Sequence, residues 1–184
     1  EVYIMRRLLL ILILSFSFQS WTKADDIKNL EMEGLSIGNS LLSYLNKKEI
    51  LDNYELIYLN EKTFSKDIAG IFYNKNLLEY DAVQVDFKLN DPDFTIVGIS
   101  GYIIYENDIS SCYKKQNEIF EDLKSFFNNV ETLKGDIEDH PGYPKGEVRL
   151  KRFSFFLSEE ERSNLEIICF EALNAKDRLS VSMK

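Results

Sequence analysis

The sequence predicts an α+β fold: a single domain in which an antiparallel sheet packs against one long helix over about residues 109–129, with a short helical pair near the N-terminus. Several segments in both halves of the chain alternate apolar and polar residues, which is typical of half-buried strands. One central segment instead repeats apolar residues at helical spacing. Strands and helices do not alternate regularly along the chain, as they do in a parallel sheet, so we expect antiparallel pairing.

The N-terminal segment is typical of a cleaved secretory signal peptide over residues 5–24. Two arginines precede an apolar run over residues 8–18, and the small side chains of Thr22 and Ala24 suit cleavage after Ala24. The apolar run is shorter than the ~20 residues that a membrane-spanning helix needs. We therefore expect export, with no stable transmembrane anchor after cleavage.

The expected mature chain is a single domain over residues 25–184, located in the periplasm or secreted. Residues 1–24 comprise the signal and four residues upstream of its methionine. The full sequence has a formal net charge of −9, and the signal removes more basic than acidic residues. Because negative charge repels phosphate backbones, nucleic acid is not an expected partner.

Two short helices are predicted after the glycines of the stretch EGLSIG. Ser40 is a suitable N-cap for a helix over residues 41–45, and Asn46 with Glu49 has the spacing of a capping box for a helix over residues 47–53. Ser40 also follows a glycine in a G-x-S pattern. A nucleophile elbow needs a second glycine where this chain has a leucine, so we expect Ser40 to be a cap.

Three stretches separate these helices from the long one. Residues 54–80 are rich in Tyr, Asn and Lys, and we expect one or two short strands and loops there. Alternation over residues 81–89 predicts a half-buried strand, and residues 94–106, apolar on both faces, predict a central strand. The polar turn between them makes an antiparallel hairpin. Gly98 and Gly101 mark a bulge or a close contact in the second strand.

The long helix is predicted to begin after Asp108, a plausible N-cap, and to end near residue 129. One face carries an apolar stripe with a single polar member, Gln116. The stripe consists of Ile109, Cys112, Gln116, Ile119, Leu123, Phe126 and Val130. Cys112 therefore faces inward from the first turn.

The two cysteines, Cys112 and Cys169, are expected to form a disulfide. Cys169 lies in an apolar strand over residues 164–172, and a helix lying on a sheet can bring the two together. In an oxidising compartment an even number of cysteines indicates a bridge. The alternatives are two separate buried thiols or a catalytic cysteine. Against the latter, the chain has no C-x-x-C motif and a single histidine, His140.

A loop and three strands are predicted in the last third of the chain. Residues 135–146 are rich in Gly and Pro and are expected to form a surface loop. Residues 147–157, 164–172 and 178–183 are expected to form a meander of strands. Glu159–Glu161 are expected to form a solvated acidic turn between two of these strands.

Two charged clusters invite a chemical interpretation, and each also has a plain structural one. The first is a group that could bind a hard cation, but it lacks the ligand spacing of a calcium loop; it consists of Asp136, Glu138, Asp139 and His140. The second could face an anion or a partner, or simply be the outward face of an edge strand; it consists of Arg149, Lys151 and Arg152 beside Phe153 and Phe155. We predict no catalytic residue, no cofactor and no metal site.

Three stretches together resemble a family of small exported proteins from marine bacteria: EGLSIGNSLLSYL, YDAVQVDF and ISGYIIYENDISSCYKKQNEI. Its members pair an E-G-hydrophobic-S-I-G-x-S-L-L opening with a later D-I-S-S-C-Y-K-K helix start, and residues 64–78 depart from the family's pattern. The resemblance implies a signal peptide and one compact domain; it carries over no catalytic residue, because no activity is established for the family. The opening turn is similar, more weakly, to outer-membrane lipoproteins that assist β-barrel assembly, but their lipidated cysteine is missing here.

Two functions from different classes are compatible with these features. The first is a non-enzymatic exported binding or interaction protein of the cell envelope, whose partner is another envelope protein or a small molecule. The second is a small secreted hydrolase that uses carboxylates, which requires a deep pocket holding two acids with pKa values pushed apart. We favour the first, because the sequence shows no nucleophile–base constellation.

Overall fold

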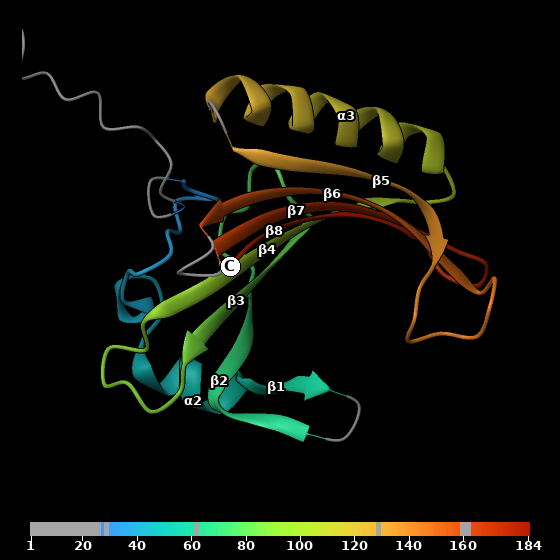
Figure 1. Ribbon diagram of the computed structural model, residues 1–184. Helices are drawn as coiled ribbons and strands as arrows, with labels where there is room; N and C mark the ends of the chain where they lie inside the picture. Colours follow the sequence, from blue (N-terminus) through green and yellow to red (C-terminus); the bar gives the residue numbers. More distant parts are fainter. Residues whose placement is uncertain (1–26, 28–29, 61–62, 128–129, 159–162) are drawn as a thin grey trace, which may run out of the picture.

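The computed structural model describes residues 27, 30–60, 63–127, 130–158 and 163–184 (Figure 1). The predicted signal peptide over residues 5–24 and the predicted acidic turn at Glu159–Glu161 lie outside the described residues. Within the described part of the chain, no helix has both the length and the apolar character needed to cross a membrane.

A single eight-stranded sheet dominates the fold (Figure 1). Its strands are β1 Glu55–Asn60, β2 Thr63–Tyr73, β3 Ala82–Lys88, β4 Ile96–Tyr105, β5 Glu131–Asp139, β6 Val148–Ser158, β7 Ser163–Ala172 and β8 Asp177–Met183. Their order is β1-β2-β3-β4-β8-β7-β6-β5, and every neighbouring pair is antiparallel. The chain therefore forms two four-stranded meanders, whose last strands, β4 and β8, pair at the centre of the sheet.

The predicted α+β class is wrong: the fold is β-rich, because the sheet contains strands that the sequence pattern did not reveal. Residues 54–80 contain β1 and the long strand β2, where one or two short strands and loops were expected. Residues 135–139, predicted as part of a surface loop, belong to β5. β5 is an edge strand with almost every residue exposed or half-exposed, so it has no buried face to produce apolar alternation.

The elements outside the sheet are helices of different length, of which the longest packs on the sheet. The 3₁₀ helix η2 spans Leu41–Ser43, α2 spans Lys47–Asn53 and α3 spans Ile109–Phe126. The side chain of Ser40 accepts a hydrogen bond from the N–H of Leu42, and both halves of the capping box at Asn46 are formed, so the two predicted N-caps are confirmed. α3 contacts β7, β8 and β4.

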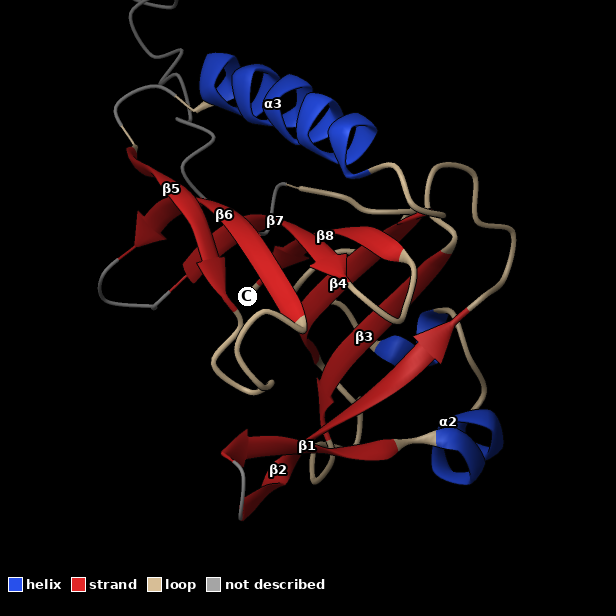
Figure 2. Ribbon diagram, turned by 90° about the vertical axis from the view of Figure 1, so that its right-hand side faces the viewer, coloured by secondary structure: helices blue, strands red, loops and turns tan. Residues whose placement is uncertain are grey.

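The buried core lies on the face of the sheet that α3 covers. The ring of Phe120 on α3 packs against two rings of β6: its centroid lies 5.2 Å from that of Phe153 and 4.9 Å from that of Phe155. The strand register places polar residues of the central strands on the opposite face: Gln84, Ser100, Ser182, Glu166 and Ser154 form one row across β3, β4, β8, β7 and β6. The sheet is strongly twisted, so that β1 and β2 run at a steep angle to β5 and β6 (Figure 2).

Candidate functional site: an apolar cleft beside the long helix

The EGLSIG stretch forms a tight two-residue turn that borders the candidate site. Met32 and Leu35 exchange backbone hydrogen bonds of 3.0 and 2.9 Å, and between them Glu33 and Gly34 have φ values of 52° and 78°. Two successive positive φ angles are typical of a type I′ turn, in which glycine is favoured. Glu33 adopts the same left-handed conformation at some cost, so its side chain must be held by other contacts.

The Glu33 carboxylate provides those contacts by binding the backbone of the loop before β3. It accepts hydrogen bonds of 2.7–3.1 Å from the N–H groups of Leu78, Glu79 and Tyr80. Desolvation tends to raise the pKa of Glu33, but the three N–H donors outweigh it and lower the pKa below its usual value. The carboxylate is therefore ionised and fixes the turn to the loop.

Gly101 on β4 allows two side chains to lie directly on the sheet. A Cβ atom at this position would lie 2.5 Å from the ring of Tyr80 and 2.8 Å from the sulfur of Met32. The predicted close contact at Gly101 is thus confirmed. Burial, followed by the nearby charges of Glu79 and Glu33, raises the pKa of Tyr80 to about 12, so its hydroxyl stays neutral.

Between this turn and α3 lies a cleft of about 610 Å³. Leu165 of β7 and Val181 and Met183 of β8 are buried and line its floor. Ile119 and Leu123, half-buried on α3, form one wall, and the turn with Met32 forms the other. The volume lies within the ~300–1,000 Å³ range of small-molecule sites, and the floor has the apolar character that such sites share.

The mouth of the cleft is acidic. Glu31, Glu33 and Glu79 contribute to its lining, and the described residues that line it include no Lys or Arg. Leu78 stands at the same mouth with its side chain 90% exposed. An apolar floor under a negatively charged rim can accept an apolar group and disfavours an anionic one.

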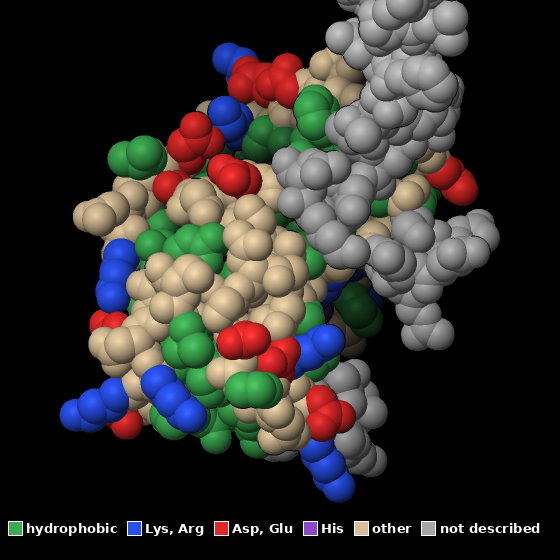
Figure 3. Space-filling model, turned by 90° about the vertical axis from the view of Figure 1, so that its left-hand side faces the viewer, with side chains coloured by type: hydrophobic (Ala, Val, Ile, Leu, Met, Phe, Trp, Pro, Cys, Tyr) green, Lys and Arg blue, Asp and Glu red, His purple; other side chains and the backbone are tan. Residues whose placement is uncertain are grey.

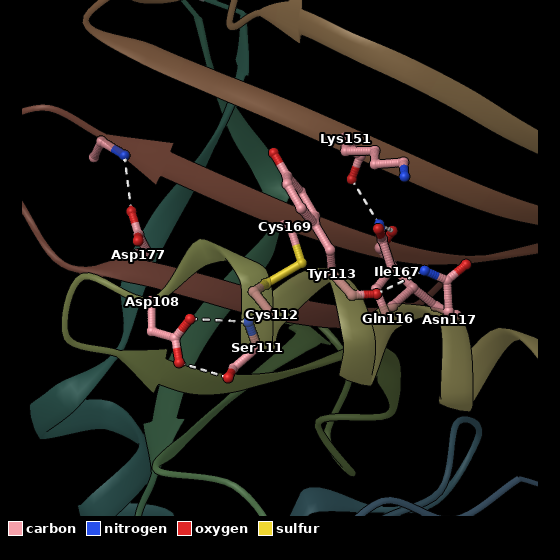
Figure 4. The surroundings of a disulfide bond; sticks show 11 residues. Asp108, Ser111, Cys112, Tyr113, Gln116, Asn117, Lys151, Ile167, Cys169 and Asp177 are labelled. Carbon is pink, nitrogen blue, oxygen red and sulfur yellow. Dashed lines mark hydrogen bonds between the residues drawn. A yellow bond between two sulfur atoms is a disulfide. The ribbon is translucent and has the colours of Figure 1, made fainter.

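The disulfide and one polar side chain hold α3 in position as a wall of the cleft. Cys112 and Cys169 are bonded and fully buried, linking the first turn of α3 to β7 (Figure 4). Further along the helix, the amide nitrogen of Gln116 donates to the carbonyls of Lys151 on β6 and Ile167 on β7, at 2.7 and 2.8 Å (Figure 4). The polar member of the predicted stripe thus connects the helix to two strands.

A second cleft, of about 700 Å³, lies between α2 and β2, and its lining is more polar. The carboxylate of Glu49 accepts a hydrogen bond from the N–H of Asn46 and pairs with Lys75 at 2.9 Å. The N–H donor first, and then Lys75, lower the pKa of Glu49. Its carboxylate is committed to closing the capping box, so we regard the apolar cleft as the better candidate site.

Apolar side chains are also exposed elsewhere among the described residues. Figure 3 shows the left-hand face of Figure 1, on which apolar side chains reach the surface among polar, acidic and basic ones. Leu42 and Leu51 in the N-terminal segment are 38% and 46% exposed. Single exposed apolar residues of this kind are ordinary on protein surfaces.

The predicted basic cluster is compensated by neighbouring acids, and β6, which carries it, is not an edge strand because it lies between β5 and β7. Arg149 makes two 2.7 Å hydrogen bonds to Glu171, and Arg152 lies 3.7 Å from Glu166. Lys151 lies over the rings of Tyr113 and Phe153. These cations therefore stabilise the sheet surface and the start of α3.

His140 organises a turn. Its Nδ1 accepts a hydrogen bond from the N–H of Gly142 at 3.0 Å, and its ring packs edge-on against Tyr143. Among the described residues, no group of three or more His, Cys, Asp or Glu side chains is arranged to hold a metal ion. The nearby Asp139 accepts a hydrogen bond from the N–H of Gly146, which closes the same turn.

Sequence reasoning missed the cleft, although one signal for it was present. Its lining comes from segments as far apart as Met32, Ile119 and Met183, and no local pattern joins them. Gly101, within an otherwise apolar strand, was the one hint that other side chains approach the sheet at this point. No protein-family model, no curated protein and no solved structure matches this chain.

Proposed function

We propose that the protein is an exported, non-catalytic binding protein that holds an apolar small molecule in the cleft between α3 and the N-terminal turn. The observation that carries this proposal is the cleft itself: a floor of Leu165, Val181 and Met183 beneath a wall of α3 side chains. Burying apolar surface of a ligand there contributes roughly 25 cal/mol per Å².

Two further features support export and rigidity. A buried disulfide is typical of proteins from oxidising compartments, in agreement with the basic and apolar start of the sequence. The bond also anchors α3, so the wall of the cleft is held before a ligand arrives. A preformed site loses less conformational entropy on binding.

The proposal is tested with N-phenyl-1-naphthylamine, an uncharged apolar probe whose fluorescence rises in apolar surroundings. The wild-type protein is expected to bind it saturably, and Leu123→Asp, which places a carboxylate on the wall, is expected to bind at least about tenfold more weakly. Leu123 is half-buried on the helix, so we expect the variant to fold; its circular dichroism spectrum checks this.

Leu133→Asp is the matched control. Leu133 lies on the edge strand β5, is 55% exposed and does not line the cleft. This variant should bind the probe as the wild type does. Absence of saturable binding to the wild type, or equal affinity in Leu123→Asp and the wild type, would overturn the proposal.

A further inference from the structure

We infer that the preferred ligand of this cleft is a cationic amphiphile, an apolar chain that ends in a positively charged group. This inference rests on the proposed function and names the ligand class. The floor is apolar and the mouth carries Glu31, Glu33 and Glu79. A small ion without an apolar part buries no apolar surface on such a floor, and an uncharged apolar molecule makes no ionic interaction with the carboxylates of the mouth.

The three carboxylates have different roles at the mouth. Glu33 is engaged by the N–H groups of Leu78, Glu79 and Tyr80, so the dipoles of these donors already compensate much of its charge. Glu31 and Glu79 are exposed, and among the described residues their carboxylates have no hydrogen-bond or ion-pair partner, so they can accept a cationic head group.

The charge of the whole chain agrees with this assignment. Acidic residues outnumber basic ones by nine over the full sequence. Arg178 on β8 and Lys184 directly after it do not line the cleft, and Arg149 and Arg152 on the neighbouring strand β6 are paired with Glu171 and Glu166. An anionic amphiphile would therefore meet a repulsive mouth without a compensating cation among the described lining residues.

The test compares three probes with the same eight-carbon chain: octylammonium, octanol and octanoate, each displacing N-phenyl-1-naphthylamine at pH 7 and low salt. Octylammonium is expected to displace the probe at about tenfold lower concentration than octanoate, with octanol between them. Raising the salt concentration should reduce this preference, because exposed charges are screened.

The variant that tests the mechanism is Glu31→Gln/Glu79→Gln, which leaves Glu33 in place to hold the loop. It should lose most of the preference for octylammonium and bind octanol unchanged. Glu118→Gln/Asp122→Asn makes the same change in net charge on exposed positions of α3 outside the cleft, and it should keep the preference.

The outcomes separate the two proposals. If the naphthylamine probe binds and the three octyl compounds displace it equally, the charge inference is wrong and the apolar site remains. If both double variants reduce the preference equally, net charge rather than the mouth is responsible, and the inference is overturned. If no probe binds to the wild type, the proposed function itself fails.

Discussion

At the scale of single residues, the buried polar side chain of Gln116 determines how α3 meets the sheet. Gln116 interrupts an apolar stripe and is fully buried, a position where an amide is tolerated only if it is hydrogen-bonded. Its nitrogen satisfies this requirement by donating to two strand carbonyls, whereas its Oε1 is buried without a partner among the described residues. The residue therefore fixes the position of the helix at some cost in stability.

Gln116→Glu should destabilise the protein by about 3 kcal/mol. The substitution replaces the donating amide with a carboxylate that faces the carbonyls of Lys151 and Ile167 in a buried site. Urea denaturation at pH 7 measures the free energy of unfolding. Asn117→Asp, the same chemical change at an exposed position one residue along, should cost less than about 1 kcal/mol; equal losses in the two variants would contradict the role given to Gln116.

At the scale of elements, the start of α3 shows how a few local hydrogen bonds define a helix boundary. The carboxylate of Asp108 accepts hydrogen bonds from the hydroxyl and the N–H of Ser111, at 2.5 and 3.1 Å (Figure 4). It also accepts one from the hydroxyl of Ser110 at 2.6 Å. The hydrogen bond from Ser110, followed by those from Ser111, lowers the pKa of Asp108 to about 2. This cap was predictable, because it depends only on residues within one turn.

The lowered pKa makes the stability contributed by Asp108 dependent on pH. A carboxyl group whose pKa is lower in the folded state stabilises the protein fully above its unfolded pKa of ~3.9, and this contribution disappears as the pH falls towards 2. Asp108→Asn keeps a good N-cap without the charge. Its thermal midpoint should therefore fall less than that of the wild type between pH 4 and pH 2.

Asp122→Asn is the control for this measurement, since it removes a carboxylate from the same helix away from its first turn. It should retain the pH dependence of the wild type over this range. If the thermal midpoint of Asp108→Asn falls between pH 4 and pH 2 as steeply as that of the wild type, the charge of the cap contributes nothing to acid sensitivity.

The burial pattern of each strand explains which strands the sequence predicted and which it did not. β3 alternates buried and half-buried residues along much of its length, and its prediction over residues 81–89 is confirmed by Ala82–Lys88. β5 offers no such pattern, because as an edge strand it is held by hydrogen bonds to β6 and not by a buried face. A bulge between Lys134 and Ile137 interrupts its pairing, and irregularities of this kind protect sheet edges from unwanted association.

At the scale of the whole molecule, the disulfide connects α3 to β7, the strand on which the helix packs. The bonded cysteines are 57 residues apart in sequence. Between them lie all of β5 and β6 and most of α3, so the covalent loop encloses the beginning of the second meander. In the chain-entropy model, closing a loop of this length stabilises the folded state by roughly 4 kcal/mol.

Cys112→Ala/Cys169→Ala should therefore lose roughly 4 kcal/mol in urea denaturation at pH 7. The wild type unfolded in the presence of a reductant should approach the stability of the double variant, which serves as the internal control. A loss below about 1 kcal/mol would mean that the bond does not constrain the unfolded chain as the loop length implies.

The sequence by itself determined the features whose causes are local. The N-caps at Ser40, Asn46 and Asp108 depend on side chains and N–H groups within one helical turn, and the inward position of Cys112 follows from helical spacing. Only the tertiary structure decided that β8 pairs with β4, that β1, β2 and β5 extend the sheet, and that a cleft opens beside α3. Strand order and edge strands depend on hydrogen bonds between distant segments. The cleft forms because Met32, Ile119 and Met183 come together from distant segments. Such long-range packing produces no periodic pattern in the sequence, so the sequence could not predict it.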